Sequence, residues 1–528
     1  MNEKRINILF SESLYYLFLG SLLCAKGIGL YDGQTVFKIV LIFAIVAWLG
    51  KLFLTSYTVR EFIIVSMVLL ISGICYIISG EKGIFLYAMM VTGLKNIPIK
   101  RLFIVGTGVW TLSFLGTTLL HLTHGVNDVF KVHEKLGMDM IIRWSLGYSH
   151  PNVLHISYLV LVMFIVYLMQ EKVNIKAAVW FMAGNIIIYI YSVSSTGLII
   201  VTFYLLLTLF FKYRKNVTKV ENIIIQLIFP GFVLVSLIGP IVLKGRMFEI
   251  INKLLNTRLF LAKYFLTIQP PTLFGTKISE ITTQLLTMDN SYVNAFVTYG
   301  IVGFGIIVVA YFLMIRKCCR EKKYSEIAII ITCLLGGLTE PFLFNTSFKN
   351  ISLLFMGMII FPSLQLQKRN VLLFHNLDKR IEINLEKITI VYKGVIQLFN
   401  RFKNKILIIS VIGGMLCGIG YHLKVDDPKK IIVPRNVIDI YIVEENPKLV
   451  PYCFELQEEK SDDVIIYGYV DDKTEMIRCD GDIIIMEHFR GIITTSIMAS
   501  SSLFMIQILF IVYRGLRSTK AFNQLQTQ

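Results

Sequence analysis

Apolar segments of about 20 residues recur along this chain from Leu14 to Arg514, and they limit its fold more than any other feature. A helix of that length crosses the ~30 Å hydrocarbon core of a bilayer and satisfies its own backbone hydrogen bonds there. The 528 residues are 55% hydrophobic and only 16% charged, unlike soluble domains. The alternating strands of a membrane barrel are not visible. The sequence therefore predicts an all-α polytopic membrane protein.

The formal net charge of +17 indicates membrane orientation rather than nucleic-acid binding. Lys and Arg gather in short clusters between apolar segments, for example from Arg316 to Lys323, as they do in cytoplasmic loops. These clusters fall at every second helix boundary, so we expect about fourteen spans and cytoplasmic termini at both ends. The charged start runs into an apolar segment without a small-residue cleavage site, so the first helix is expected to remain in place.

Changes in composition predict a membrane core followed by a smaller appendage. The predicted divisions are a core of about twelve helices (1–367) with two large external loops (121–151 and 243–290), a cytoplasmic basic amphipathic linker (368–404), two transmembrane helices (405–514) flanking an external domain (422–493), and a cytoplasmic tail (515–528). Alternating β-branched residues predict strands in the external domain, at Val437–Val443, Asp463–Val470 and Asp482–Met486. Cys453 and Cys479 fall there and either pair with each other or remain as thiols.

The first polar motif lies between two apolar segments and reads RWSLGYSHPNVLH, from Arg143 to His155. Pro151 is suited to the first position of a helix, with a capping residue just before it. The first-turn N–H groups of that helix suit a phosphate at headgroup depth, and Arg143 can grip phosphate oxygens with two donors. The alternative is an ordinary capped helix whose Arg143 reaches lipid headgroups.

A second arginine-bearing segment follows in the loop at 243–290. Apolar and polar residues alternate there at helical spacing, which predicts one helix lying along the outer interface and ending at Pro270 and Pro271. This helix carries Arg246 and Arg258.

Carboxylates accompany the arginines later in the chain. Asp289 opens a predicted helix and is either its N-cap or a general base. Glu340 lies near the external end of a predicted span. Burial of an ionisable group is energetically costly there and therefore suggests a function, and the alternative is a structural pair with Lys349. Neither a zinc-type ligand spacing nor a glycine-rich nucleotide loop stands out, so we expect no metal and no cofactor.

In their order along residues 1–366, these stretches resemble the Wzy-type polysaccharide repeat-unit polymerases of the O-antigen polymerase and ligase superfamily. The resemblance is closest to those of Gram-positive capsule and exopolysaccharide loci. The stretches that carry it are Arg143–Asn152 (R-x-S-L-G-Y-x-H-P-N), Tyr191–Gly197 (YSVSSTG), Asn256–Arg258 with Leu273–Gly275, Asp289–Tyr292 and Glu340–Asn345.

The resemblance implies a metal-independent glycosyltransferase on the outer face of the cytoplasmic membrane. Its substrates would be oligosaccharide repeat units linked to undecaprenyl pyrophosphate, and its partners the flippase and chain-length regulator of the same pathway, with no nucleic acid. Arg143, Arg258 and Arg246 would hold the pyrophosphate. Asp289 stands where ligase relatives carry a histidine and is the candidate base, with His150 as its competitor. The supporting residues would be Asn152, His155, Asn290, Tyr292 and Glu340.

Two other functions remain open from the sequence. A lipid-linked oligosaccharide flippase has a similar number of spans, but it should line a central cavity with cations and keep its external loops short. A ligase that transfers finished polymer to another acceptor differs only in the acceptor. The part after residue 368 departs from the family pattern and either contacts the polymer or a partner, or is an addition without such a role.

Overall fold

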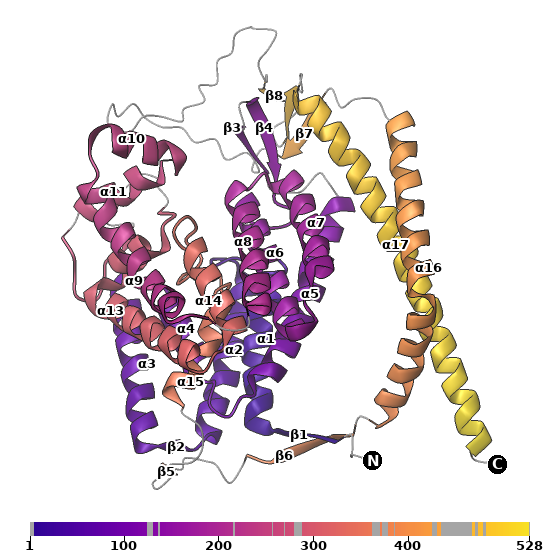
Figure 1. The fold of residues 1–528 in the computed structure, drawn as a ribbon, viewed down its shortest axis with the longest axis horizontal. Coiled ribbons are helices and arrows are strands. Elements are labelled where there is room, and N and C mark those ends of the chain that lie inside the picture. The colour runs from indigo at the N-terminus through magenta and orange to yellow at the C-terminus, as the bar shows by residue number, and fades with distance from the viewer. Residues whose placement is uncertain are drawn as a thin grey trace.

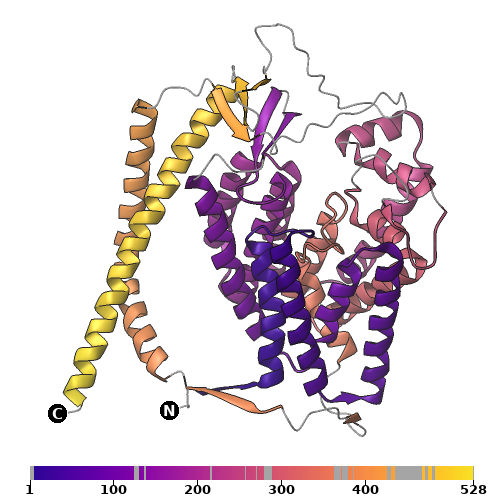
Figure 2. The same cartoon turned by 180° about the vertical axis from the view of Figure 1, so that it is seen from behind.

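The computed structural model describes residues 5–123, 130–135, 138–214, 217–255, 257–268, 270–278, 288–361, 370–371, 378–384, 386–424, 430–434, 467–469, 474–478 and 482–526. Helices dominate this part of the chain (Figures 1 and 2). The α-helices are α1 (Phe10–Gly27), α2 (Thr35–Leu54), α3 (Val59–Ser79), α4 (Gly83–Thr92), α5 (Ile99–Thr123), α6 (Pro151–Met169), α7 (Ile175–Ser192), α8 (Ser195–Tyr213), α9 (Lys219–Val242), α10 (Gly245–Leu254), α11 (Arg258–Ile268), α13 (Ser291–Arg320), α14 (Tyr324–Gly336), α15 (Gly357–Ile360), α16 (Glu386–Lys424) and α17 (Asp482–Gln526). Two 3₁₀ helices are η2 (Gln170–Lys172) and η3 (Ile351–Phe355).

The strands are short and form small antiparallel sheets at the two ends of the helices. They are β1 (Arg5–Leu9) with β6 (Arg380–Asn384), β2 (Tyr57–Thr58) with β5 (Asn370–Val371), β3 (Phe130–Lys135) with β4 (Met138–Trp144), and β7 (Lys430–Pro434), β9 (Thr474–Arg478) and β8 (Tyr467–Tyr469) in that order. We call the face with β3, β4 and α10 the upper face, as it lies in Figure 1. Both chain ends lie at the opposite, lower face.

Ten helices in the described part are long and apolar enough to cross a membrane, eight of them before residue 321 and two in the C-terminal part. Their outward surfaces expose large apolar side chains, such as Ile39 and Ile42 on α2 and Leu70 on α3. Those surfaces suit lipid, because the hydrophobic effect disfavours their contact with water. The chain is therefore a multi-pass membrane protein, while the expected number of about fourteen full spans and the twelve-helix core are not confirmed.

Helices α4 and α14 are too short to cross a membrane as full spans. Helix α4 has 10 residues and α14 has 13, which corresponds to about 15–20 Å of helix. After α14 the chain runs without regular structure to η3 and α15. The backbone there is tolerated because it is buried in protein. Asn350 secures it by donating to the Leu343 carbonyl at 2.8 Å and to the Tyr311 hydroxyl at 2.7 Å.

Helix α13 is kinked at Gly300, and the residues around Gly275 pack against the kink. Gly300 has φ of 70° and ψ of −177°, so the helical hydrogen bonds are broken there. The residues around Gly275 fill the break, since the backbone N–H of Ile301 donates to the Thr272 carbonyl at 2.9 Å. A Cβ atom on Gly275 would lie 1.8 Å from the Thr298 carbonyl oxygen. Only glycine fits such a close backbone approach, which explains the glycine at this position of the sequence motif.

The C-terminal helices α16 and α17 pack along each other and stand beside the core in both views (Figures 1 and 2). At the lower face the β1–β6 pair ties the start of the chain to the segment before α16. At the upper face α17 reaches α5 and β4. The pair is therefore attached to the core near both of its ends.

The C-terminal part differs from the sequence prediction in two respects. Residues 482–486, expected as a strand, form the start of α17, and residues 386–404 of the expected linker are continuous with the following span in α16. Both segments are helical because they extend two long helices, α16 and α17, that pack against each other. The expected β-rich domain is described only as β7, β8 and β9, and Cys453 and Cys479 lie outside the described residues.

The loop at 243–290 also differs, since its expected single helix is two helices, α10 and α11. The break falls at Thr257, whose φ is 66°. A threonine at positive φ is strained, and a continuous helix cannot pass through it.

At the lower face, the buried ion pair between Lys95 and Glu61 generates a stability prediction. Their side chains are 4% and 10% exposed. Lys95→Met should destabilise the protein by about 3–5 kcal/mol because it leaves the Glu61 carboxylate buried without its cation. The measurement is thermal unfolding of the purified protein in detergent, where Glu61→Gln added to Lys95→Met should restore part of the loss.

The matched control is the partly exposed pair Lys82–Asp32, with side chains 32% and 30% exposed and a separation of 2.9 Å. Lys82→Ala should cost less than about 1 kcal/mol. Equal losses for Lys82→Ala and Lys95→Met would contradict the importance of the buried pair.

Candidate functional site

Helix α6 begins at Pro151, as the sequence predicts, and its first turn faces the upper side of the molecule. The cap is His150, whose Nδ1 accepts a hydrogen bond from the Asn152 backbone N–H at 3.0 Å. This bond satisfies one of the N–H groups that a helix start leaves without a partner. The Asn152 side chain is thereby held at the start of α6, where it contacts two charged residues.

Arg143, at the end of β4, is 5% exposed and lies against the end of α7. Its Nε donates to the Ser192 carbonyl at 2.9 Å, and its Nη2 donates to Asn152 Oδ1 at 2.6 Å. A cation at a helix C-terminus is favoured by the helix dipole. Burial lowers the pKa of Arg143 to about 10, with the Glu340 carboxylate opposing the shift and the Arg258 guanidinium adding to it. Arg143 is therefore still a cation at neutral pH.

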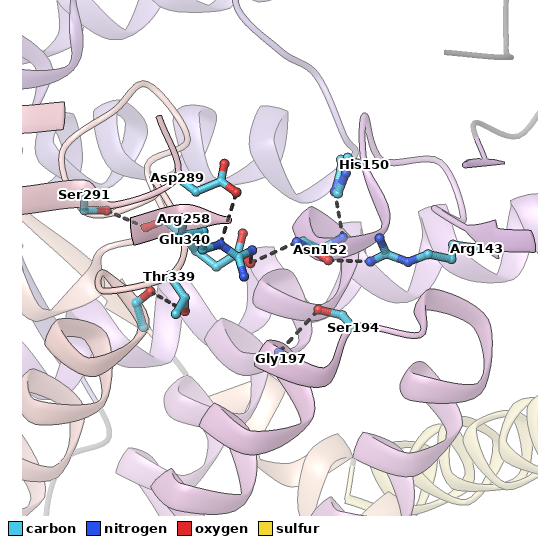
Figure 3. A network of polar contacts seen from close by, with 11 residues as sticks. Arg143, His150, Asn152, Ser194, Gly197, Arg258, Asp289, Ser291, Thr339 and Glu340 are labelled. Carbon is cyan, nitrogen blue, oxygen red and sulfur yellow. Dashed lines mark hydrogen bonds and ion pairs between the residues drawn. The ribbon is translucent and has the colours of Figure 1, made fainter. Parts of the chain in front are cut away.

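Glu340 links the Arg143 side of the site to Arg258. Its Oε1 accepts from Asn152 Nδ2 at 2.9 Å and from Arg258 Nη2 at 3.2 Å (Figure 3). The start of α13 holds the Glu340 backbone, since the Ser291 hydroxyl donates to the Glu340 carbonyl at 2.5 Å. Because that carboxylate is 9% exposed, the charge of Arg258 is needed to stabilise it.

Arg258 also contacts the second carboxylate, with its Nε 3.2 Å from Asp289 Oδ2 (Figure 3). Arg258 is the first residue of α11, where the helix dipole disfavours a cation. The two carboxylates offset that effect. The Asp289 side chain is 30% exposed and that of Arg258 is 14% exposed, so Asp289 forms the open edge of the cluster.

The network therefore runs from Arg143 through Asn152 and Glu340 to Arg258 and Asp289. We call these five residues the arginine–carboxylate network. It joins β4, the starts of α6, α11 and α13, and the segment after α14. Two guanidinium groups balance two carboxylates, so the network can exchange one carboxylate for an anionic ligand without leaving a guanidinium unpaired.

One structural alternative from the sequence is wrong. Asp289 is not the cap of α13, because Asn290 Oδ1 accepts from the backbone N–H groups of Tyr292 and Val293 at 2.9 and 3.1 Å. Glu340 pairs with Arg258 at 3.2 Å, and Lys349 donates to the Val153 carbonyl at 2.9 Å within reach of the Glu340 charge.

Three of the expected supporting residues are positioned as parts of the frame around the network. His155 is fully buried, with Nδ1 3.1 Å from Ser192 Oγ and Nε2 2.7 Å from Asn185 Oδ1. Asn290 caps α13, and the buried Tyr292 hydroxyl donates to the Leu334 carbonyl at 2.6 Å. These contacts fix helix positions instead of facing a ligand.

Arg246 is the expected phosphate ligand that the structure does not bring to the network. It lies exposed on the first turn of α10, and none of the described contacts joins it to Arg258. The break at Thr257 explains the difference, because it separates α10 from the helix that Arg258 starts.

Sequence reasoning missed the roles of Ser192 and Ser291. Ser192 provides the carbonyl that seats Arg143 and the hydroxyl that contacts His155. Ser291 holds the segment that carries Glu340. Both serines lie inside or beside stretches that the family resemblance had singled out, but only spatial contacts assign them a role.

No group of three or more metal-ligating side chains occurs in the part of the chain that the structure describes. Comparison with known proteins adds no relative: neither a family model, nor a curated protein, nor a solved structure matches the chain.

The charge balance of the network predicts the effect of Glu340→Gln. This change keeps an oxygen for Asn152 but removes the negative charge beside Arg258, so it should destabilise the protein by about 1.5–3 kcal/mol. The measurement is thermal unfolding in detergent. Glu326→Gln is the control, since the Glu326 carboxylate accepts from the Tyr167 hydroxyl at 3.1 Å outside the network, and it should cost less. Wild-type stability of Glu340→Gln would show that its charge does not balance the arginine.

Proposed function

We propose that this protein is a glycosyltransferase that polymerises undecaprenyl-pyrophosphate-linked oligosaccharide repeat units into capsular polysaccharide or exopolysaccharide. It works in the cytoplasmic membrane, with the upper face outside the cell and both termini in the cytoplasm. The observation that carries the proposal is that one hydrogen-bonded network connects Arg143 and Arg258, which are 115 positions apart in the sequence. This arrangement supports a shared anionic ligand at the ends of membrane helices, where a lipid diphosphate would lie.

The exposure of the two carboxylates favours one order of events when the diphosphate binds. The Asp289 carboxylate is the more exposed of the two that contact Arg258, at 30% against 9% for that of Glu340. Arg258 therefore exchanges Asp289 for a phosphate oxygen, while Glu340 keeps the guanidinium in place. The exchange releases the Asp289 carboxylate beside the bound donor, where a base is needed.

The proposed transfer then proceeds without a metal. An acceptor sugar hydroxyl attacks the anomeric carbon of the donor chain, a new glycosidic bond forms, and the bond from that carbon to the diphosphate oxygen breaks. Asp289 takes the hydroxyl proton, and undecaprenyl diphosphate leaves with its added charge stabilised by the two guanidinium groups. His150 is the weaker candidate base, because its Nδ1 already accepts from the Asn152 backbone.

The competing flippase function has less support. A transporter for a charged headgroup needs polar or cationic groups along its cavity. The cavity of about 130 Å³ between α3, α4 and α13, lined by residues such as Val68, Ile307 and Met356, does not suit such a headgroup, because no charged side chain lies among its lining residues, although Lys26, Lys51 and Lys349 are buried elsewhere in the core. The ligase function uses the same network and differs in its acceptor.

The arginine pair gives the first test of this function. Arg143→Ala and Arg258→Ala should each lower polymer formation by about 10²–10³-fold, because each removes a donor to the leaving group. The assay supplies purified protein in lipid with a defined lipid-linked repeat unit and resolves the ladder of longer products by electrophoresis.

Arg246→Ala is the matched control, since Arg246 is exposed and outside the network. It should retain the ladder. A folded Arg143→Ala or Arg258→Ala protein that polymerises at the wild-type rate would contradict the proposal, and transfer to a non-lipid acceptor alone would favour the ligase.

The base assignment has its own test. Asp289→Asn should lower turnover by about 10²–10⁴-fold, because an amide cannot take the acceptor proton. His150→Ala should have a smaller effect that arises from the lost cap of α6. Single-turnover rates with saturating donor measure both changes, and the reverse ranking would move the base role to His150.

A further inference from the structure

The end of α7 is the point where the C-terminal helices meet the site. The last four carbonyls of a helix have no partner within it. In α7 two of these four carbonyls have other partners: the Val193 N–H donates to the Tyr189 carbonyl at 2.7 Å, and Arg143 Nε donates to the Ser192 carbonyl. The remaining two carbonyls, of Ile190 and Tyr191, are reached by a residue nearly 300 positions away.

That residue is Arg490 of α17, which is 3% exposed. Its Nε donates to the Ile190 carbonyl at 3.0 Å, and its Nη2 donates to the carbonyls of Ile190 at 2.8 Å and Tyr191 at 3.4 Å. A second bond joins the same elements, because the Tyr191 and Thr494 hydroxyls lie 2.7 Å apart. Two buried guanidinium groups, one from β4 and one from α17, thus share one helix end.

The backbone between these contacts is strained. Val193 follows the end of α7 with φ of 43°, a conformation that β-branched residues adopt only when their surroundings enforce it. Ser194 then caps α8 through a bond from the Gly197 N–H at 3.3 Å. Loss of Arg490 would remove its donors from the Ile190 and Tyr191 carbonyls and allow this turn, including the Ser192 carbonyl that accepts from Arg143, to relax.

We propose that Arg490 is a positioning residue for Arg143, so that the C-terminal helix pair is part of the machinery that prepares the anion site. The role in catalysis rests on the proposed function, whereas the mechanical link between Arg490 and Arg143 does not. The lower part of α17 exposes large apolar side chains such as Ile506 and Leu509, whereas its upper end contacts the core at β4 and α5 as well as through Arg490. Displacement of α17 at its upper end would therefore be transmitted to Arg143.

The experiment compares Arg490→Ala and Arg490→Lys with Arg514→Ala in the full-length protein in lipid. Arg514 is the control because it lies exposed on the same helix, over the Phe510 ring and away from α7. Hydrogen–deuterium exchange follows the backbone amides of 190–199 and 138–148. The polymerisation assay is run in parallel on the same samples.

Arg490→Ala should speed exchange in both segments and lower polymer formation at least about tenfold, since it removes charge-assisted hydrogen bonds. Arg490→Lys should lie between, because an ammonium keeps the favourable charge at the helix end but lacks the planar fork. Arg514→Ala should match the wild type in both readouts.

The outcomes separate the two proposals. Unchanged exchange at 138–148 in Arg490→Ala would overturn the link to Arg143, whatever the activity. Faster exchange with full polymerisation would overturn the positioning role. If the wild type makes no polymer while Arg490→Ala still speeds exchange in both segments, the link stands and the polymerase proposal fails.

Discussion

The structure depends on how buried guanidinium groups are compensated at helix ends near the upper face. Arg143 is stabilised by the C-terminal carbonyl of α7, and Arg258 is stabilised by two carboxylates that offset the dipole of its own helix. A buried cation without such partners would destabilise the fold by several kcal/mol. The positions of β4, α6, α7, α11 and α13 are therefore coupled through charge as well as through apolar packing.

This coupling explains why the short helices matter. The irregular segment after α14 carries Glu340 into the space between α6 and α11, which a straight helix of the same sequence would not do. Ser291 and Asn350 satisfy backbone carbonyls of that segment, so its irregular path is stable inside the protein. The kink at Gly300 in α13 is stabilised in the same manner, because the segment around Gly275 supplies carbonyl acceptors for the N–H groups that have no partner within the helix.

The candidate site was predictable in part. Arg143, Asn152, Arg258, Asp289 and Glu340 stand out in the sequence as polar groups beside apolar segments, and they come together in one network. Their partners were not predictable, because Asp289 could equally cap α13 and Glu340 could equally pair with Lys349. Arg246 and Arg258 look alike in sequence, and only the break at Thr257 separates them. Arg490 carries no local signal, since its partners lie in α7.

The sequence by itself determined the membrane class, the approximate limits of most helices and the start of α6. Hydrophobic length and proline act locally, so these features can be derived from neighbouring residues. Only the tertiary structure decided which predicted spans are too short to cross a membrane, that residues 482–486 begin α17, and which charges meet. Those outcomes depend on partners far away in the chain, because a buried charge or an irregular backbone is stable only where another element supplies its hydrogen bonds.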